Sequence, residues 1–307
     1  MSSMERAFMQ GPAGFPGAGL FSGRSAARAL LLLLAALLAG CEGEITMDLG
    51  TELPADPDII QVVANVRGLE FTNSSGGSKT LEFTDSQAID FIDLADDNGL
   101  LRLFTDEELS EGTYTGVRLL FDEDRADDAF VSLLDGTQFP LNLAAGEYAP
   151  LRFEVEDGES SSESFILVLD LRKSLSFDDD DDEYTLTPVL RTVVAADASR
   201  IEGNVSVSCP AGGDLSAGAV YLFQGRDITP DDIDGAGVEP FATAPIFTAQ
   251  NGSSFFYALR YLPEGNYTLA VTCIGNDEDP LEDQDLKFRN VINVNLDEQE
   301  ILTRNLP

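Results

Sequence analysis

Hydrophobic and polar residues alternate along most of this chain with a period of two, and the alternation becomes regular from residue 58 onward. Residues 60–67 give a clear example, with Ile60, Val62 and Ala64 on one side. Successive side chains of a strand point to opposite faces, so this pattern predicts a strand with one face against a core. Similar short runs, separated by turns rich in Gly, Ser and Asn, continue to the C-terminus and predict an all-β fold.

The first part of the chain contains several such strands and two less regular segments. Phe165 to Leu169 is apolar at every position, which predicts a central strand buried on both faces. Thr105 and Glu108 match a capping box, so we expect one helical turn over 105–109. Residues 88–94 fit a short strand or a helical turn equally well. The expected strands are 60–67, 80–83, 117–121, 130–134, 139–143, 151–155, 164–171 and 184–194.

A short polar joint over 195–200 precedes a second group of strands. Asn251-Gly252 between two strand-like runs predicts a tight hairpin. Residues 227–245, with three Pro and two Gly, predict a long loop. The strands expected in this second group are 201–208, 219–223, 246–250, 254–262, 267–274, 291–296 and 301–306.

Two stretches, Leu109 to Thr115 and Leu262 to Thr268, share the pattern Leu-x-Glu-Gly-x-Tyr-Thr ahead of a strand. Gly at this position permits a positive φ. The following tyrosine is expected to pack its ring inward and to donate its hydroxyl to the preceding backbone, as in the tyrosine corner of β-sandwiches. We therefore predict two β-sandwich domains in tandem, over residues 58–196 and 197–307.

The N-terminal segment carries a ten-residue apolar run over 29–38, preceded by Arg24 and Arg28. The run is too short to cross a bilayer, which needs about 20 residues. It ends in Leu38-Ala39-Gly40-Cys41, which resembles the lipobox of bacterial lipoprotein precursors. The resemblance implies cleavage before Cys41, a diacylglycerol on its sulfur and a further acyl chain on the new amino terminus. An ordinary secretory signal or a buried core helix remain the alternatives.

The resemblance implies that residues 1–40 are a lipoprotein signal peptide, which precedes the two expected sandwiches. Residues 41–57, with Pro54, Pro57 and several acids, read as a tether that lifts the first domain off the lipid. Two or three acyl chains anchor a protein stably, so the membrane is an expected partner. In such lipoproteins an aspartate after the cysteine favours the inner membrane, whereas here Glu42 follows. We expect a lipid-anchored protein of the cell envelope, at the outer membrane.

The amino-acid composition argues against several classes of binding partner and of catalytic site. The chain carries a net charge of −37; residues 1–40 contribute +2 from three Arg and one Glu, so residues 41–307 carry −39. Such a charge repels nucleic acid and anionic lipids. The chain has no His, which removes His-based general base catalysis, Ser-His-Asp triads and His-ligated zinc. It has no Trp, the best platform for stacking cations or sugars.

If Cys41 carries lipid, Cys209 and Cys273 remain as an even pair in an oxidising compartment. Each continues the alternation of an expected strand on its inward side, as a bridge across the sandwich requires. A loop of their 64-residue separation corresponds to roughly 4 kcal/mol of stabilisation on the chain-entropy model. Two free buried thiols are the alternative.

The acidic clusters are the only constellations that suggest a bound cofactor, and the cofactor would be calcium. Six consecutive carboxylates occur in 178–183, and shorter clusters lie in 122–128, 231–234 and 277–279. Calcium takes about six to eight oxygen ligands, often from loops, but no stretch has EF-hand spacing. A solvated acidic hairpin tip is the alternative to a structural calcium site. The ligands considered are Asp178, Asp180, Asp182 and Glu183.

Two family resemblances cover most of the chain beyond the signal. Residues 56–194 resemble the bacterial domain of unknown function DUF4382, through Asp56-Pro57, Glu111 to Leu119 (Glu-Gly-Thr-Tyr-Thr-Gly-Val-Arg-Leu) and Tyr184 to Arg191. Residues 201–307 are similar to the prealbumin-like sandwich of carboxypeptidase regulatory domains. The first resemblance implies a surface lipoprotein with a β-rich module, and it brings no catalytic residues.

These observations favour a non-catalytic binding or structural module rather than an enzyme. A rigid sheet with variable loops is the usual division of labour, so a ligand would meet loops at the sandwich ends, such as 227–245. Carbohydrate or another envelope protein are the expected ligand classes. The alternative is an envelope hydrolase that uses a carboxylate pair, which 55 acidic residues always allow.

Overall fold

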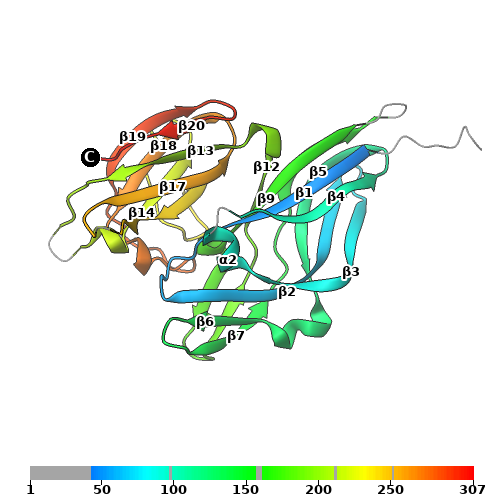
Figure 1. The fold of residues 1–307 in the computed structure, drawn as a ribbon, viewed down its shortest axis with the longest axis horizontal. Coiled ribbons are helices and arrows are strands. Elements are labelled where there is room, and N and C mark those ends of the chain that lie inside the picture. The colour runs from blue at the N-terminus through cyan, green and yellow to red at the C-terminus, as the bar shows by residue number, and fades with distance from the viewer. Residues whose placement is uncertain (1–42, 97–98, 157–160, 211–212, 251) are drawn as a thin grey trace, which may run out of the picture. The chain divides into compact units, whose positions relative to one another are not determined.

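The computed structural model describes residues 43–96, 99–156, 161–210, 213–250 and 252–307, and it confirms the all-β fold. Residues 41–307 form one compact unit, in which two β-sandwiches follow one another (Figure 1). The predicted signal peptide over 1–40 and the predicted lipidation site Cys41 lie outside the described residues. Among the described residues, no helix has the length and apolar character needed to cross a membrane.

The first sandwich packs a four-stranded sheet against an eight-stranded one. The small sheet has the order β12-β9-β1-β4, and the large sheet has the order β10-β11-β7-β6-β2-β5-β8, with β3 paired to β2. The strands are β1 (Gly43–Glu52), β2 (Ile59–Asn73), β3 (Ser78–Asp90), β4 (Leu101–Leu109), β5 (Gly112–Phe121), β6 (Phe130–Leu133), β7 (Gln138–Leu143), β8 (Ala149–Val155), β9 (Ser162–Asp170), β10 (Leu175–Asp178), β11 (Glu183–Leu186) and β12 (Leu190–Val194).

The second sandwich consists of two four-stranded sheets, with the orders β16-β17-β13-β20 and β15-β14-β18-β19. Neighbouring strands in these sheets are antiparallel, except for β13 and β20, which are parallel. Its strands are β13 (Ser199–Val205), β14 (Ala219–Gln224), β15 (Ala242–Pro245), β16 (Phe247–Thr248), β17 (Phe255–Leu262), β18 (Gly265–Thr272), β19 (Arg289–Leu296) and β20 (Ile301–Thr303).

Helices are short and lie between strands. The capping-box prediction over 105–109 is wrong, because these residues belong to β4 and pair with β1, for example Glu107 with Ile45. Residues 88–94 are part strand and part helix, since β3 ends where α2 begins. The described helices are α2 (Phe91–Asp96), α3 (Leu171–Ser174) and the 3₁₀ turns η2 (Glu123–Asp128), η3 (Ala195–Asp197), η4 (Leu215–Ala217) and η5 (Gly275–Asp277).

The tether predicted for residues 41–57 is wrong over most of its length, because Gly43–Glu52 is β1, an inner strand of the small sheet. This strand pairs with β4 on one edge and with β9 on the other, so its backbone groups are bonded on both sides. Ile45, Met47 and Leu49 are fully buried in the core. Glu44, Asp48 and Glu52 lie within this strand, and only Pro54 and Pro57 follow it.

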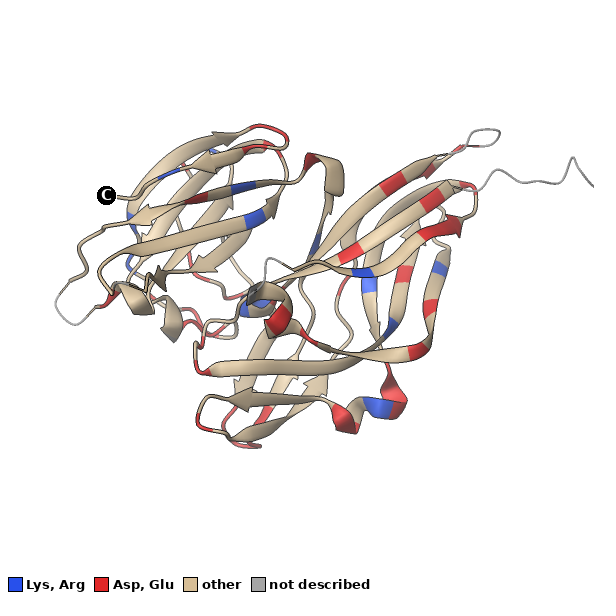
Figure 2. Cartoon of the chain, in the orientation of Figure 1, with Lys and Arg blue, Asp and Glu red and all other residues tan. Residues whose placement is uncertain are grey.

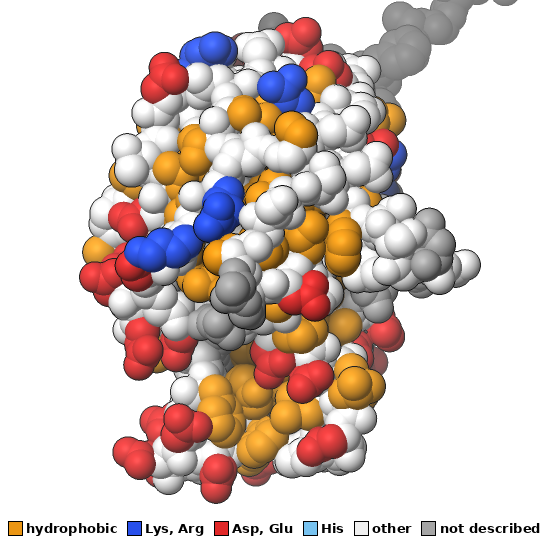
Figure 3. Space-filling model, turned by 90° about the vertical axis from the view of Figure 1, so that its left-hand side faces the viewer, with side chains coloured by type: hydrophobic (Ala, Val, Ile, Leu, Met, Phe, Trp, Pro, Cys, Tyr) orange, Lys and Arg blue, Asp and Glu red, His pale blue; other side chains and the backbone are white. Residues whose placement is uncertain are grey.

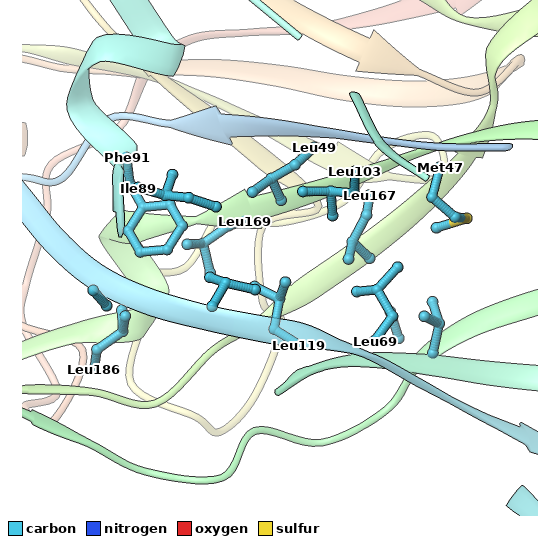
Figure 4. Close-up of a cluster of buried hydrophobic side chains, with 14 of the residues drawn as sticks. Met47, Leu49, Leu69, Ile89, Phe91, Leu103, Leu119, Leu167, Leu169 and Leu186 are labelled. Atoms are coloured by element: carbon cyan, nitrogen blue, oxygen red, sulfur yellow. The ribbon is translucent and has the colours of Figure 1, made fainter. Parts of the chain in front are cut away.

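Both faces of the β1–β9 pair are covered by protein. One face meets the large sheet, where Met47, Leu49, Leu167 and Leu169 pack against Leu69 and Leu119 (Figure 4). The other face meets the second sandwich, and Gly50 allows this approach. A Cβ at that position would lie 2.9 Å from Cε2 of Tyr261 in β17.

The continuously apolar run in β9 is buried on both faces, as its sequence predicts. Ile166 and Val168, which point away from the first core, are 3% and 0% exposed. Ile166 shares a surface depression with Ser199, Arg260 and Tyr261 of the second sandwich. Over the second half of β9 the small sheet therefore lies between two other layers, whereas the paired residues Glu44 and Ser162 at the start of the strands are exposed.

The two tyrosine corners and the disulfide follow the predictions, with one difference in position. The Tyr114 hydroxyl donates to the carbonyl of Ser110 (3.0 Å), and the Tyr267 hydroxyl donates to the carbonyl of Pro263 (2.9 Å). Cys209 and Cys273 form a disulfide. Both cysteines lie just beyond the ends of strands rather than within them.

The loop expected over 227–245 is shorter and more ordered than the sequence suggests. Its last residues form β15, which pairs with β14. Ile233 from the loop is buried with Tyr221, Phe223 and Leu286 in a separate hydrophobic cluster on the outer side of the β14–β18 sheet. The loop thus covers one face of the sheet. Its amino-acid composition does not predict this, because only a few of its residues make the hydrophobic contacts.

Candidate functional site

Six ionisable side chains gather where the two sandwiches meet, and we call them the buried charge cluster. The first sandwich supplies most of them from the adjacent ends of β1, β9 and β12 and from α3, and the second supplies one from the loop after β18. The cluster contains three acids and three bases, so it is neutral when all are ionised. Its members are Glu52, Asp170, Arg172, Lys173, Arg191 and Glu278.

Arg172 is the centre of the cluster, and its side chain is completely buried. It donates from Nη1 to the carbonyl oxygen of Gly275 at 2.5 Å, and the same nitrogen lies 3.7 Å from Oε2 of Glu278. The Glu278 side chain is also fully buried, and its Oε1 accepts from the backbone N–H of Ile233 at 2.7 Å. Because Arg172 and Glu278 come from different sandwiches, this ion pair joins them in a region without solvent.

A second set of contacts joins the sandwiches beside Arg172. Arg191 donates from Nη2 to Oε1 of Glu52 (2.7 Å) and to the carbonyl of Arg260 (3.0 Å). Lys173 donates from Nζ to the carbonyl of Pro240. Arg260 in turn donates to the carbonyl of Ala95 at 2.8 Å. Four cationic side chains therefore cross the junction, each ending on a carbonyl of the other sandwich.

Burial decides the charge state of two carboxyl groups in the cluster. Burial raises the pKa of Glu278 to about 7, although the Ile233 N–H and Arg172 oppose the rise. Burial likewise raises the pKa of Glu52 to about 7, opposed by Arg191 and reinforced by the negative charge of Asp170. In both cases the cost of removing a carboxylate from water exceeds the attraction of its partner.

A groove with a volume of about 420 Å³ opens beside the cluster, with walls from both sandwiches. This volume lies within the range of about 300–1,000 Å³ typical of small-ligand sites. Phe241 and Val189 form apolar parts of the wall, and Arg191 lies over the Phe241 ring at 5.5 Å. Gln224 and Glu239 add polar groups at the rim.

The cluster contains two carboxyl groups that could be considered as a catalytic pair. Glu52 and Asp170 are partners in the β1–β9 register and lie side by side at the strand ends. Asp170 is occupied in capping α3, where its Oδ1 accepts from the Lys173 N–H at 3.2 Å. Glu52 is covered by Arg191, and the cavity next to it holds about 30 Å³. That space fits roughly one water molecule and no glycosidic bond.

The predicted calcium ligands do not converge in the described part of the chain. Asp178, Asp180, Asp182 and Glu183 lie at the β10–β11 hairpin, whose tip is exposed, and Oδ1 of Asp178 accepts from the backbone N–H of Asp180. Acidic residues are instead spread over both sandwiches (Figure 2). On the face shown in Figure 3 they surround hydrophobic side chains in its lower part.

Within the described ranges, a different group of acidic residues could hold a metal ion. Ligand oxygens of Asp232, Asp234 and Asp283 lie within 4.8 Å of one another. Asp232 is buried, which raises its pKa, and it accepts from the Gln284 N–H. The sequence marked the first two of these aspartates as a cluster but gave no signal that joined them to Asp283. Calcium binding stays a prediction.

The comparisons with known proteins support the first sandwich as a family domain. Residues 43–188 match the family model described as Domain of unknown function (DUF4382), which confirms the resemblance seen in the sequence. The match starts at Gly43 and therefore includes β1. No curated protein matches the chain. The similarity of the second sandwich to prealbumin-like domains stays a prediction.

Several solved structures are distantly similar. The Bacillus anthracis TIE protein is 12% identical with a TM-score of 0.21; the match covers 86% of this chain but 34% of that protein, so the chain spans about a third of its length. A candidate adhesin from Bacteroides ovatus is 12% identical with a TM-score of 0.20, over 87% and 89% of the two chains. The fimbrial anchor protein Mfa2 from Porphyromonas gingivalis is 10% identical with a TM-score of 0.19, over 78% and 80%.

The raised pKa of Glu278 predicts how stability changes with pH. Between about pH 4.5 and 7 the folded protein holds a proton that the unfolded chain releases, so the free energy of unfolding falls as pH rises. A shift of this size corresponds to roughly 3 kcal/mol. Glu278→Gln removes this titrating carboxyl group. Between about pH 4.5 and 7 we therefore expect the free energy of unfolding, measured with urea, to fall by up to roughly 3 kcal/mol more in the wild type than in the variant. Glu282→Gln, at an exposed site, is the matched control; equal pH slopes for wild type and Glu278→Gln would contradict the assignment.

Proposed function

We propose that the protein is a lipid-anchored module of the bacterial cell envelope, at the outer membrane, that binds a ligand without changing it chemically. The anchor rests on the sequence Leu38-Ala39-Gly40-Cys41, and the module rests on the two joined sandwiches. The observation that carries the proposal is the groove beside the buried charge cluster. It has walls from both sandwiches, and the cluster holds those walls in one fixed arrangement.

The state of the carboxyl groups supports binding rather than hydrolysis. Glu52, Asp170 and Glu278 are each held by a cation or a backbone N–H, and Glu52 and Glu278 have little contact with solvent. A hydrolase of the carboxylate-pair class needs two carboxyl groups that flank the bond it cleaves. The cavity at Glu52 is too small to admit one.

Carbohydrate is the ligand class that the groove fits best. Its wall combines the Phe241 ring and the Val189 side chain with hydrogen-bonding groups on Gln224 and Glu239. Sugars present apolar C–H faces together with hydroxyl groups, so they match a wall of this kind. The cations Lys173 and Arg191 already have partners, which argues against an anionic ligand. A loop of an envelope protein is the second class that such a groove accepts.

The location is tested by changing the modified residue. Cys41→Ser removes the sulfur that carries the diacylglycerol, so we expect the protein to leave the membrane fraction and to appear in the soluble fraction. Separation of inner and outer membranes on a density gradient gives the location of the wild type. Retention of Cys41→Ser in a detergent-requiring fraction would contradict lipid anchoring.

The ligand class is tested with purified protein against a panel of envelope glycans. We expect binding by calorimetry to at least one glycan, weakened about tenfold by Phe241→Ala or Gln224→Ala, since losing one good contact costs about 1.4 kcal/mol. Phe256→Ala is the matched control, because Phe256 is a partly exposed aromatic residue on β17 and does not line the groove. Unchanged affinity in both groove variants would exclude the groove as the binding site.

A further inference from the structure

The first strand of the fold begins directly after the proposed lipid attachment. Only Cys41 and Glu42 separate the cleavage position from Gly43, the first residue of β1. Two residues in an extended chain span at most about 7 Å. If Cys41 is lipidated, as the proposed function requires, the start of β1 is therefore held next to the lipid head groups.

The first residues of β1 are fixed in the sheet, so they cannot extend the short link between the lipid and the domain. Gly43 pairs with Leu109 of β4, and the Glu44 N–H donates to the carbonyl of Ser161 at 2.8 Å. A Cβ on Gly43 would lie 2.4 Å from Cγ2 of Val155 and 2.8 Å from Oγ of Ser161. The strand is thus enclosed by neighbouring strands from its first residue, and it cannot peel away without opening the sheet.

Three other segments lie beside the start of β1: the β2–β3 turn, the β4–β5 turn and the residues at the start of β9. We call these three segments together the anchor-side end. Gly112 pairs with Val155, which lies against Gly43, and the N–H of Ser74 donates to the carbonyl of Thr113 at 2.9 Å. Figure 1 shows the start of β1 beside the end of β4 and the start of β5. The anchor-side end consists of residues 74–77, 110–112 and 161–162.

We propose that the anchor-side end faces the head groups of a phospholipid bilayer directly, without a spacer. Its exposed residues are mostly Ser and Gly, which are small and polar and allow close approach to a head-group layer. Glu111 is exposed there and Glu156 lies nearby, so electrostatic attraction to anionic lipid does not hold it. The short covalent link imposes the orientation.

This orientation fixes which end of the first sandwich points away from the membrane. β2 begins beside the β6–β7 turn, where the Leu134 N–H donates to the carbonyl of Asp58 at 2.8 Å, and it ends at the anchor-side end. Fifteen strand residues span up to about 45 Å. The β6–β7 turn, residues 134–137, is therefore held far from the lipid, together with the exposed acidic hairpin that follows β10.

The experiment measures the distance of each end from lipid head groups. Lipidated protein with a fluorophore on Ser74→Cys or on Thr137→Cys is reconstituted into phosphatidylcholine vesicles that carry a head-group spin-label quencher. Both positions are exposed, which makes them matched sites. We expect several-fold stronger quenching at position 74 than at position 137. Equal quenching, or stronger quenching at 137, in vesicle-bound protein would overturn the orientation.

A spacer variant and flotation separate this inference from the anchor itself. Ten Gly and Ser residues inserted between Glu42 and Gly43 leave the lipid in place but free the domain, so quenching at position 74 should fall while the protein still floats with vesicles. Unchanged quenching in the spacer variant would show that the link does not set the orientation. Wild-type protein that does not float would contradict the lipid anchor, and with it the proposed location.

Discussion

The structure depends on the fact that both faces of the β1–β9 pair are covered by protein. One face completes the core of the first sandwich, and the other face is the surface on which the second sandwich packs. Burying both faces of a strand pair gains apolar burial twice, and it requires small or apolar residues on both sides. Gly50, Ile166 and Val168 meet this requirement on the outer side.

The same geometry explains why charged residues are buried at the junction. β1 and β9 end together, and their last residues, Glu52 and Asp170, leave the apolar part of the sheet where the second sandwich begins. Residues 41–307 contain fifteen basic residues against a large excess of acids, yet three of the fifteen lie in this cluster. Buried ion pairs add little net stability, but a wrong arrangement leaves charges unpaired. The cluster therefore selects one arrangement of the two sandwiches, and that arrangement shapes the groove.

Much of the fold could be predicted from the sequence, because alternating apolar and polar residues indicate a strand with one buried face. The buried run in β9 and both tyrosine corners were predictable from local pattern. Residues 43–52 also alternate, with Ile45, Met47 and Leu49 on one side, but the acids and prolines around them suggested a tether. The helical turn over 105–109 failed because pairing with β1 outweighs a local capping pattern.

The site was less predictable, because it joins residues that are far apart in the chain. Arg172 and Glu278 are separated by more than a hundred positions, and nothing local marks either as buried. The one available signal is that Arg172 and Lys173 directly follow the apolar run of β9, where a solvated pair of cations is unexpected. The acidic hairpin after β10 is exposed at its tip, which agrees with the solvated alternative. The three aspartates that converge come instead from two loops that are far apart in the sequence, so no local pattern joins them.

Hydrogen exchange of the β1 amides tests the central claim most directly. If β1 is an inner strand covered on both faces, the amides of residues 45–50 exchange only when the whole domain unfolds, as slowly as those of β9. Exchange of these amides at the rate of an exposed, unstructured segment would contradict the account, because residues 43–52 would then be a tether after all.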